Sequence, residues 1–156
     1  MKTPSFPIKS VLAQELRKAG FVGSSTTWHK QCQDTVLVVN LQKSQYSQLF
    51  YINLGVWVRQ LGDVGLPKES QCHIRVRATS LPTEKAKTLE RALTLEDESM
   101  GAEQREAFIS EFVRVEALPF LESLATLEGI RAAMDAQKLR GGMVPVRLRE
   151  LLARQS

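Results

Sequence analysis

The sequence has little cysteine or histidine and no long hydrophobic run. It contains two cysteines and two histidines in 156 residues, which excludes a disulfide-stapled secreted scaffold. No apolar stretch approaches the roughly 20 residues that cross a bilayer, so we expect no transmembrane helix. The N-terminal segment carries Glu15, Arg17 and Lys18 and lacks the continuous apolar stretch of a signal peptide. These absences predict a cytoplasmic protein with free thiols and no membrane partner.

Charge is present in ordinary amount but is unevenly distributed along the chain. Residues 1–79 hold ten Lys and Arg against four acidic residues, residues 80–137 hold six against twelve, and residues 138–156 hold five against one. A nucleic-acid-binding protein more often carries a dense basic stripe on one face, so nucleic acid is not an expected partner. The 43% hydrophobic and 24% charged residues are typical of one folded domain of this length.

The first 80 residues show the periodicity of one helix followed by strands. Apolar residues at helical spacing from Ile8 to Ala19 predict a helix that ends at Gly20. Strands are predicted at Thr26–Cys32, 35–43, 49–58 and Cys72–Thr79. In the last of these, alternation points Cys72, Ile74, Val76 and Ala78 toward the core, and His73, Arg75, Arg77 and Thr79 toward the opposite side.

From Leu81 onward the hydrophobic period becomes helical. The predicted helices are Lys85–Leu93, one from about Ala102 that Pro119 kinks or breaks, Leu127–Gln137 capped by Thr126, and a last one opened by Pro145. This order predicts an α+β fold: an N-terminal helix, a four-stranded mainly antiparallel sheet, and a helical C-terminal half packed on the sheet. Residues 1–156 are expected to form a single domain, with the helix and sheet in 1–80 and the helical half in 81–156.

Two asparagines interrupt the apolar runs of the central strands, where β-branched residues would be favoured. Side-chain alternation turns Leu37, Val39, Leu41, Ile52 and Leu54 into the core. If Leu41 opposes Ile52, the same register sets Asn40 against Asn53, Gln42 against Tyr51 and Val36 against Trp57. The second face of the sheet is then polar, aromatic and basic. Its candidate binding residues are Asn40, Gln42, Tyr51, Asn53, Trp57, His73, Arg75 and Arg77.

This face has a structural and a functional interpretation. Buried amides need hydrogen-bond partners, so Asn40 and Asn53 can serve only to satisfy each other or a covering segment. Alternatively, amides, guanidinium groups and an aromatic ring recognise a protein or a small anionic ligand. Gly55 leaves room there for close backbone approach or a bulge. We expect Asn40 to be partly buried and the side with Tyr51, Arg75 and Arg77 to stay open.

The thiol and imidazole side chains do not predict a metal site or a cofactor. His29 and Cys32 point to opposite faces of an extended strand, as do Cys72 and His73, and their spacing lacks the usual zinc-ligand patterns. Two buried thiols and two surface histidines are expected instead. No nucleophile elbow, triad spacing or oxyanion glycine motif accompanies them, so the sequence does not predict an enzyme. An enzyme whose site assembles from distant residues is the alternative.

Several short motifs resemble a known family. The segments LRKAGF, VVNLQKS, FYINLGV and CHIRVR, with Trp28 after the first, resemble the bacterial family named domain of unknown function 4304. The resemblance runs mainly through the first half and implies a small bacterial cytosolic domain without established activity, so it supplies no catalytic residues. We expect a non-enzymatic protein-interaction or ligand-binding module that uses the sheet face opposite the main core. Single-stranded nucleic-acid binding ranks third, because aromatic residues make up only 6% of the chain.

Overall fold

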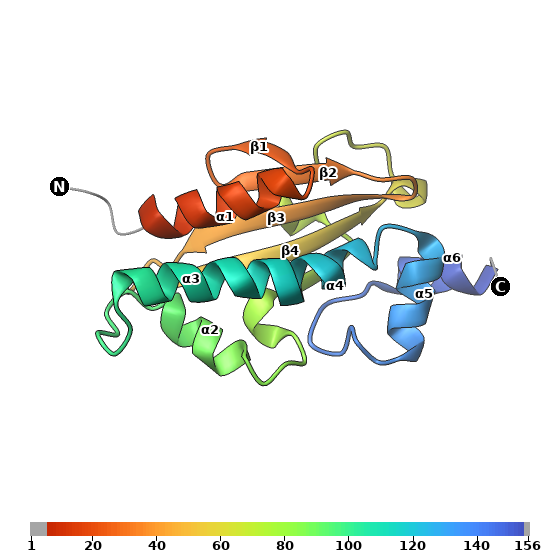
Figure 1. The fold of residues 1–156 in the computed structure, drawn as a ribbon. Coiled ribbons are helices and arrows are strands. Elements are labelled where there is room, and N and C mark those ends of the chain that lie inside the picture. Colours follow the sequence, from red (N-terminus) through yellow and green to blue (C-terminus); the bar gives the residue numbers. More distant parts are fainter. Residues whose placement is uncertain (1–5, 155–156) are drawn as a thin grey trace.

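A computed structural model describes residues 6–154, and within them five antiparallel strands lie behind a layer of helices (Figure 1). The helix α1, Phe6–Lys18, is followed by β1 Val22–Ser24, β2 Thr27–Gln31, β3 Thr35–Lys43, β4 Phe50–Val58 and β5 Ile74–Arg77. The sheet order is β1-β2-β3-β4-β5, so each strand pairs with its neighbour in sequence. The helical half comprises α2 Ala86–Ala92, α3 Ala102–Phe112, a π-helical turn Val113–Ala117, α4 Leu118–Glu122, α5 Leu127–Asp135 and α6 Val146–Arg154. The α+β fold is thus confirmed, with five strands rather than four.

The core lies between one face of the sheet and the helices. Figure 1 shows α1, α3 and α4 along the near side of the strands and α5 and α6 at one end. The predicted inward residues Leu37, Val39, Leu41, Ile52 and Leu54 all belong to this core. The predicted register is also confirmed, since Leu41 pairs with Ile52. We call the face turned away from the helices the outer face.

The additional strand, β1, was predicted as a connection. It pairs with β2 through Val22–His29, Gly23–Trp28 and Ser24–Thr27. Gly23 permits this pairing, because a Cβ there would lie 2.2 Å from the Thr27 carbonyl oxygen and 2.7 Å from the Cα of Trp28. Three residues are too few to show an alternating pattern, so no strand was predicted at this segment.

The last strand is shorter than predicted. It spans Ile74–Arg77, between the 3-10 turns η2 Glu69–Gln71 and η3 Ala78–Ser80. Cys72 follows directly after η2 and packs with Val36, Val38 and Trp57 on the outer face. The prediction that Cys72 faces the core was therefore wrong, because strand alternation does not extend to a residue that ends a turn.

Pro119 does alter its helix, although the chain stays helical through it. The π-helical turn Val113–Ala117 separates α3 from α4, and Pro119 lies in the first turn of α4. Proline has no N–H to donate to the carbonyl four residues earlier, and a wider turn accommodates that loss. The predicted cap of α5 is confirmed, since the Thr126 hydroxyl accepts a hydrogen bond from the Gly129 N–H at 3.0 Å.

Candidate functional site

The outer face is covered at one end. There Val36, Val38, Trp57 and Cys72 form a small second core, with Val64 from the segment after β4 packed against them. The Trp57 indole N–H donates to the Gly62 carbonyl at 2.9 Å, and the ring lies 4.3 Å from that of His73. The candidates Trp57 and His73 therefore hold the segment between β4 and β5 on the sheet and are not part of an open binding surface.

The prediction that His73 lies on the surface was wrong, because the side chain is buried. Only 9% of it is exposed, and its Nδ1 accepts a hydrogen bond from the Val58 N–H at 2.9 Å. Burial lowers the pKa of His73, and the charge of Arg147 lowers it further. The imidazole is thus a neutral acceptor that fixes the end of β4, which is a structural role.

The two thiols are poor candidates for chemistry. Burial, reinforced by the Glu69 carboxylate, raises the pKa of Cys72 to about 12. Cys32 is half-buried, and burial raises its pKa as well. Because the thiolate is the reactive form, neither cysteine is activated as a nucleophile. Within residues 6–154, no group of three or more His, Cys, Asp and Glu side chains could hold a metal ion.

The candidate amides form a hydrogen-bonded ladder across β2, β3 and β4. Asn53 is buried, and its amide group donates to Asn40 Oδ1 at 3.2 Å and to Gln42 Oε1 at 2.9 Å. Asn40 is half-buried and donates in turn to Thr27 Oγ1 at 3.0 Å. These bonds satisfy the donors of both asparagines. The ladder therefore supports a structural role for the two asparagines. It also fixes the Asn53 and Gln42 side chains at the open end of the outer face.

The other end of the outer face is open and carries two arginines, Arg75 and Arg77, which differ in whether the protein neutralises their charge. Arg75 is half-buried and neutralised, because its Nε lies 3.1 Å from Glu69 Oε2. Arg77 is exposed, and its guanidinium carbon lies 3.8 Å from the centroid of the Tyr51 ring. No carboxylate in the described part of the chain forms an ion pair with Arg77. Stacking on Tyr51 therefore restrains a guanidinium whose charge is not neutralised by the protein.

A cavity of about 400 Å³ lies beside these residues, and we call it the arginine pocket. It is lined by Gln42, Asn53, Glu69, Arg75, Val76, Arg77, Ser80, Arg140, Gly141, Gly142 and Met143. It brings together four of the eight predicted site residues. Two more contact members of the lining, since Tyr51 stacks on Arg77 and Asn40 accepts a hydrogen bond from Asn53. Three guanidinium groups against one carboxylate make it a positively charged pocket. Guanidinium groups bind carboxylate and phosphate groups through paired N–H donors.

One wall of the arginine pocket comes from a segment that the sequence did not link to the sheet. Met143 pairs with Arg75 through two backbone hydrogen bonds, of 2.9 and 3.2 Å. The approach is close enough that a Cβ on Gly142 would lie 2.4 Å from Val76 Cγ2, and one on Gly141 would lie 2.7 Å from the Ser80 carbonyl oxygen. This contact brings Arg140 to the pocket. Adjacent glycines are typical of a helix end, but they also permit close backbone approach.

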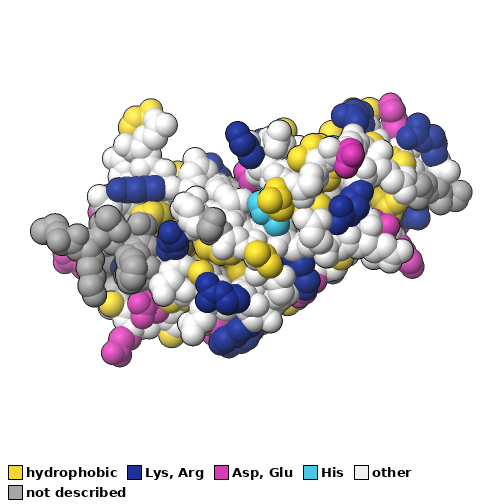
Figure 2. Space-filling model, turned by 90° about the horizontal axis from the view of Figure 1, so that it is seen from above, with side chains coloured by type: hydrophobic (Ala, Val, Ile, Leu, Met, Phe, Trp, Pro, Cys, Tyr) yellow, Lys and Arg dark blue, Asp and Glu magenta, His cyan; other side chains and the backbone are white. Residues whose placement is uncertain are grey.

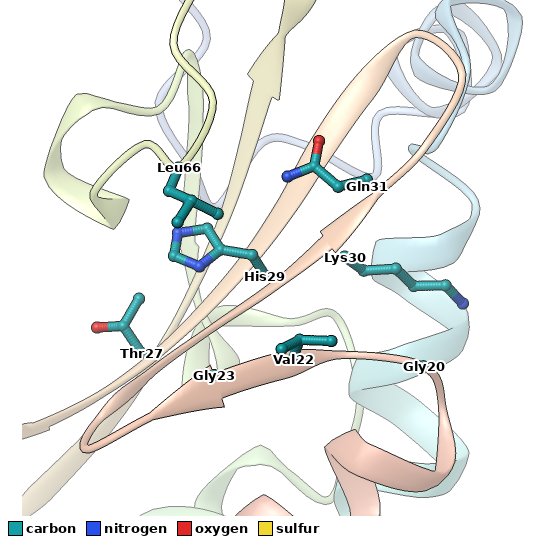
Figure 3. Close-up of a pocket in the computed structure, with 8 residues that line it drawn as sticks. All are labelled: Gly20, Val22, Gly23, Thr27, His29, Lys30, Gln31 and Leu66. Carbon is teal, nitrogen blue, oxygen red and sulfur yellow. The ribbon is translucent and has the colours of Figure 1, made fainter.

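A larger cavity, of about 630 Å³, lies at the edge formed by β1 and β2. Figure 3 shows His29 and Leu66 pointing toward each other on one side of β2 and Lys30 pointing to the other. Its polar groups are already occupied: His29 Nε2 lies 2.7 Å from the Pro67 carbonyl oxygen, and Lys30 Nζ lies 2.6 Å from Glu122 Oε2. The cavity is therefore better explained as packing between β2 and the segment at Leu66 than as a charged binding site.

The distribution of charge on the edge seen in Figure 2 is mixed. Lys and Arg side chains are scattered among acidic, hydrophobic and uncharged ones on that face, without a continuous basic stripe.

No helix among residues 6–154 is long and apolar enough to cross a membrane.

The fold and the pocket define a small α+β domain with a polar, arginine-lined pocket on the outer face of a five-stranded sheet. The model of the family described as "Domain of unknown function (DUF4304)" matches residues 12–123, and the chain belongs to this family. The match contains every strand of the sheet and ends just after α4. Arg140 and the glycines of the pocket wall lie outside it. Comparisons with curated proteins and with solved structures gave no match.

Proposed function

We propose that this protein is a non-catalytic binding module of the bacterial cytoplasm, and that its arginine pocket takes the carboxylate or phosphate group of a small ligand or a protein partner. The observation that carries the proposal is the guanidinium group of Arg77. It is stacked on Tyr51, it lines a cavity, and no carboxylate of residues 6–154 forms an ion pair with it. Two cysteines without a disulfide support a reducing compartment.

The neighbours of Arg77 support an anion over a neutral ligand. Arg75 and Arg140 line the same cavity, and the single carboxylate there, Glu69, is already paired with Arg75. Like charges in one cavity repel, and a bound anion would relieve that repulsion. Gln42 adds a polar contact, because its Oε1 accepts from Asn53 and the ladder thereby holds the amide N–H donors of Gln42 in place.

The chemistry of the lining supports binding rather than catalysis. Arginine stays protonated near neutral pH, and amides neither donate nor accept protons in catalysis at that pH. Glu69, the carboxylate of the lining, is paired with Arg75. Base stacking is less well supported, because Trp57 is 9% exposed and one face of the Tyr51 ring is occupied by Arg77.

The test is a titration of the protein with methyl phosphate and with acetate, followed by NMR of the ¹⁵N-labelled chain. We expect resonances of residues 75–77 and 140–142 to shift, and Arg77→Gln to weaken binding roughly tenfold or more, as expected for loss of a charge-assisted hydrogen bond. Arg17→Gln removes the same charge from an exposed position on α1 and is the matched control. Equal affinity of the two variants, or no binding of either anion, would contradict the proposal.

A further inference from the structure

We infer that the ligand joins its anionic group to a short apolar chain, and that this chain lies in a second cavity next to the arginine pocket. This inference rests on the proposed function and adds the class of ligand to it. The second cavity has a volume of about 410 Å³ and is lined by Ser70, Cys72, His73, Arg75, Met143, Val144 and Pro145. We call it the apolar pocket.

The two pockets are neighbours. Arg75 and Met143 line both of them, and the same two residues pair through their backbones. The arginine pocket lies toward Arg77, and the apolar pocket toward His73 at the other end of β5. A ligand that extends along β5 past Arg75 would therefore enter both.

The lining of the second pocket favours an apolar group. Met143, Val144 and Pro145 are apolar, and Met143 is 63% exposed although it is a large hydrophobic residue. The polar members carry little charge: the Cys72 thiol stays protonated, and the lowered pKa of His73 keeps its imidazole neutral near pH 7. Apart from Arg75, which is paired with Glu69, no charged side chain lines this pocket.

The two pockets differ in the charge of their lining residues, and this difference predicts how the ligand is oriented along β5. Of these two pockets, Arg77 and Arg140 line the arginine pocket and not the apolar one, whereas Val144 and Pro145 line the apolar pocket and not the arginine one. The anionic group is thus expected at the Arg77 end of β5 and the chain at the His73 end. Each cavity lies within the range of roughly 300–1,000 Å³ that is typical of small-molecule sites.

The test compares methyl phosphate with n-hexyl phosphate by calorimetry, below the concentration at which the longer ester forms micelles. Each buried methylene tightens binding roughly three- to fourfold. Since the hexyl ester has about five more methylenes than the methyl ester, we expect it to bind roughly several hundredfold more tightly. Met143→Ser and Val144→Ser should each remove most of this gain. Val144→Ser should also leave the affinity for methyl phosphate unchanged, because Val144 does not line the arginine pocket. Val146→Ser is the matched control, because Val146 is 67% exposed and lines neither pocket.

The outcomes separate this inference from the proposed function. If methyl phosphate binds through Arg77 but the longer chain gives no gain, or a gain that Met143→Ser and Val144→Ser leave intact, the inference is overturned and the proposed function stands. If Arg77→Gln keeps the full affinity for hexyl phosphate, adsorption of the chain explains the binding and the inference is again overturned. If neither ester binds, both proposals fail together.

The same chemistry occurs in soluble phosphate esters and in lipid head groups, and a second arm distinguishes these sources. Vesicles of phosphatidylcholine containing phosphatidic acid are sedimented with the protein and with its Arg77→Gln and Met143→Ser variants. Binding of hexyl phosphate without sedimentation supports a soluble ligand. Sedimentation that depends on Arg77 and Met143 supports a lipid, with the same head and chain contacts.

Discussion

Asn53 lies directly opposite Asn40 in the β3–β4 pair and donates a hydrogen bond to its Oδ1 at 3.2 Å. The second amide hydrogen of Asn53 reaches Gln42, on the same strand as Asn40. A buried amide bonded in this way stabilises the sheet, and it also holds an exposed amide at the rim of the arginine pocket. The structural and functional interpretations of the two asparagines are therefore compatible, and they apply to different atoms of one ladder.

Replacing Asn53 with Ala should destabilise the fold. The change removes two hydrogen bonds and leaves the Asn40 acceptor without its partner, so we expect a loss of about 1–3 kcal/mol in the free energy of unfolding. Gln42→Ala, at the exposed end of the ladder, should stay within about 0.5 kcal/mol of wild type. Urea denaturation of the two variants measures the difference. Equal stability of both would mean that the ladder contributes little to the fold.

The strand pairing could be predicted from the sequence because two alternating apolar patterns leave few choices. Once Leu41 faces Ile52, every other pair of β3 and β4 follows, and a slip by one residue would expose the whole apolar set. The open side of the outer face, with Tyr51 and Arg77, follows from the same alternation.

The boundaries of the candidate site could not be predicted in this way. The segment that covers Trp57 has no hydrophobic period, and the wall at residues 140–143 is joined to β5 by backbone hydrogen bonds that leave no side-chain pattern. A contact of that kind depends on the tertiary path of the chain. Its only local sign is the pair Gly141 and Gly142, which is equally typical of a helix end.

The buried His73 should make stability depend on pH. Its pKa in the folded protein is lowered below the value of about 6.5 that applies when unfolded. Between these two pKa values the unfolded chain binds more protons, so the contribution of His73 is complete above about pH 6.5 and is lost as the pH falls toward the folded pKa. Melting temperatures between pH 7 and 5 should fall less steeply in His73→Phe than in wild type. An unchanged slope in His73→Phe would assign the effect to other groups.

Arg105 should be one of the most sensitive positions for stability. It is 7% exposed, and its guanidinium donates to the backbone carbonyls of Arg91, Ala92, Thr94, Asp97 and Met100. Arg105→Met leaves these carbonyls without their donor, and we expect a loss of about 3 kcal/mol or more. Arg91→Met, at an exposed position nearby, should cost less than about 1 kcal/mol. Chemical denaturation of the two variants tests this, and a cost for Arg105→Met no larger than that for Arg91→Met would contradict it.

Glu69 should compete with the ligand for Arg75. Its carboxylate is mostly buried and occupies that guanidinium at 3.1 Å. Glu69→Gln removes the negative charge from the arginine pocket and frees Arg75, so we expect the affinity for methyl phosphate to rise several-fold. The gain should shrink as salt increases, which titrations at low and high sodium chloride measure. Glu128→Gln, at an exposed position on α5, is the control. An unchanged affinity in Glu69→Gln would place the anion away from Arg75.

A substitution in the wall of the arginine pocket should weaken ligand binding while the protein stays folded. A Cβ on Gly142 would lie 2.7 Å from the Arg75 carbonyl oxygen as well as 2.4 Å from Val76 Cγ2, so Gly142→Ala must push residues 140–143 away from β5. The two backbone hydrogen bonds between Arg75 and Met143 would weaken, and Arg140 would move from the pocket. The sheet itself does not depend on this contact, because β5 is paired with β4 along its other edge. We therefore expect a folded protein with a modestly lower melting temperature and strongly weakened binding of methyl phosphate. Gly65→Ala is the matched control, since a Cβ there would meet nothing within 4 Å. If Gly142→Ala binds the anion as tightly as Gly65→Ala does, the wall is not part of the site, and the anion must be held by the sheet residues alone.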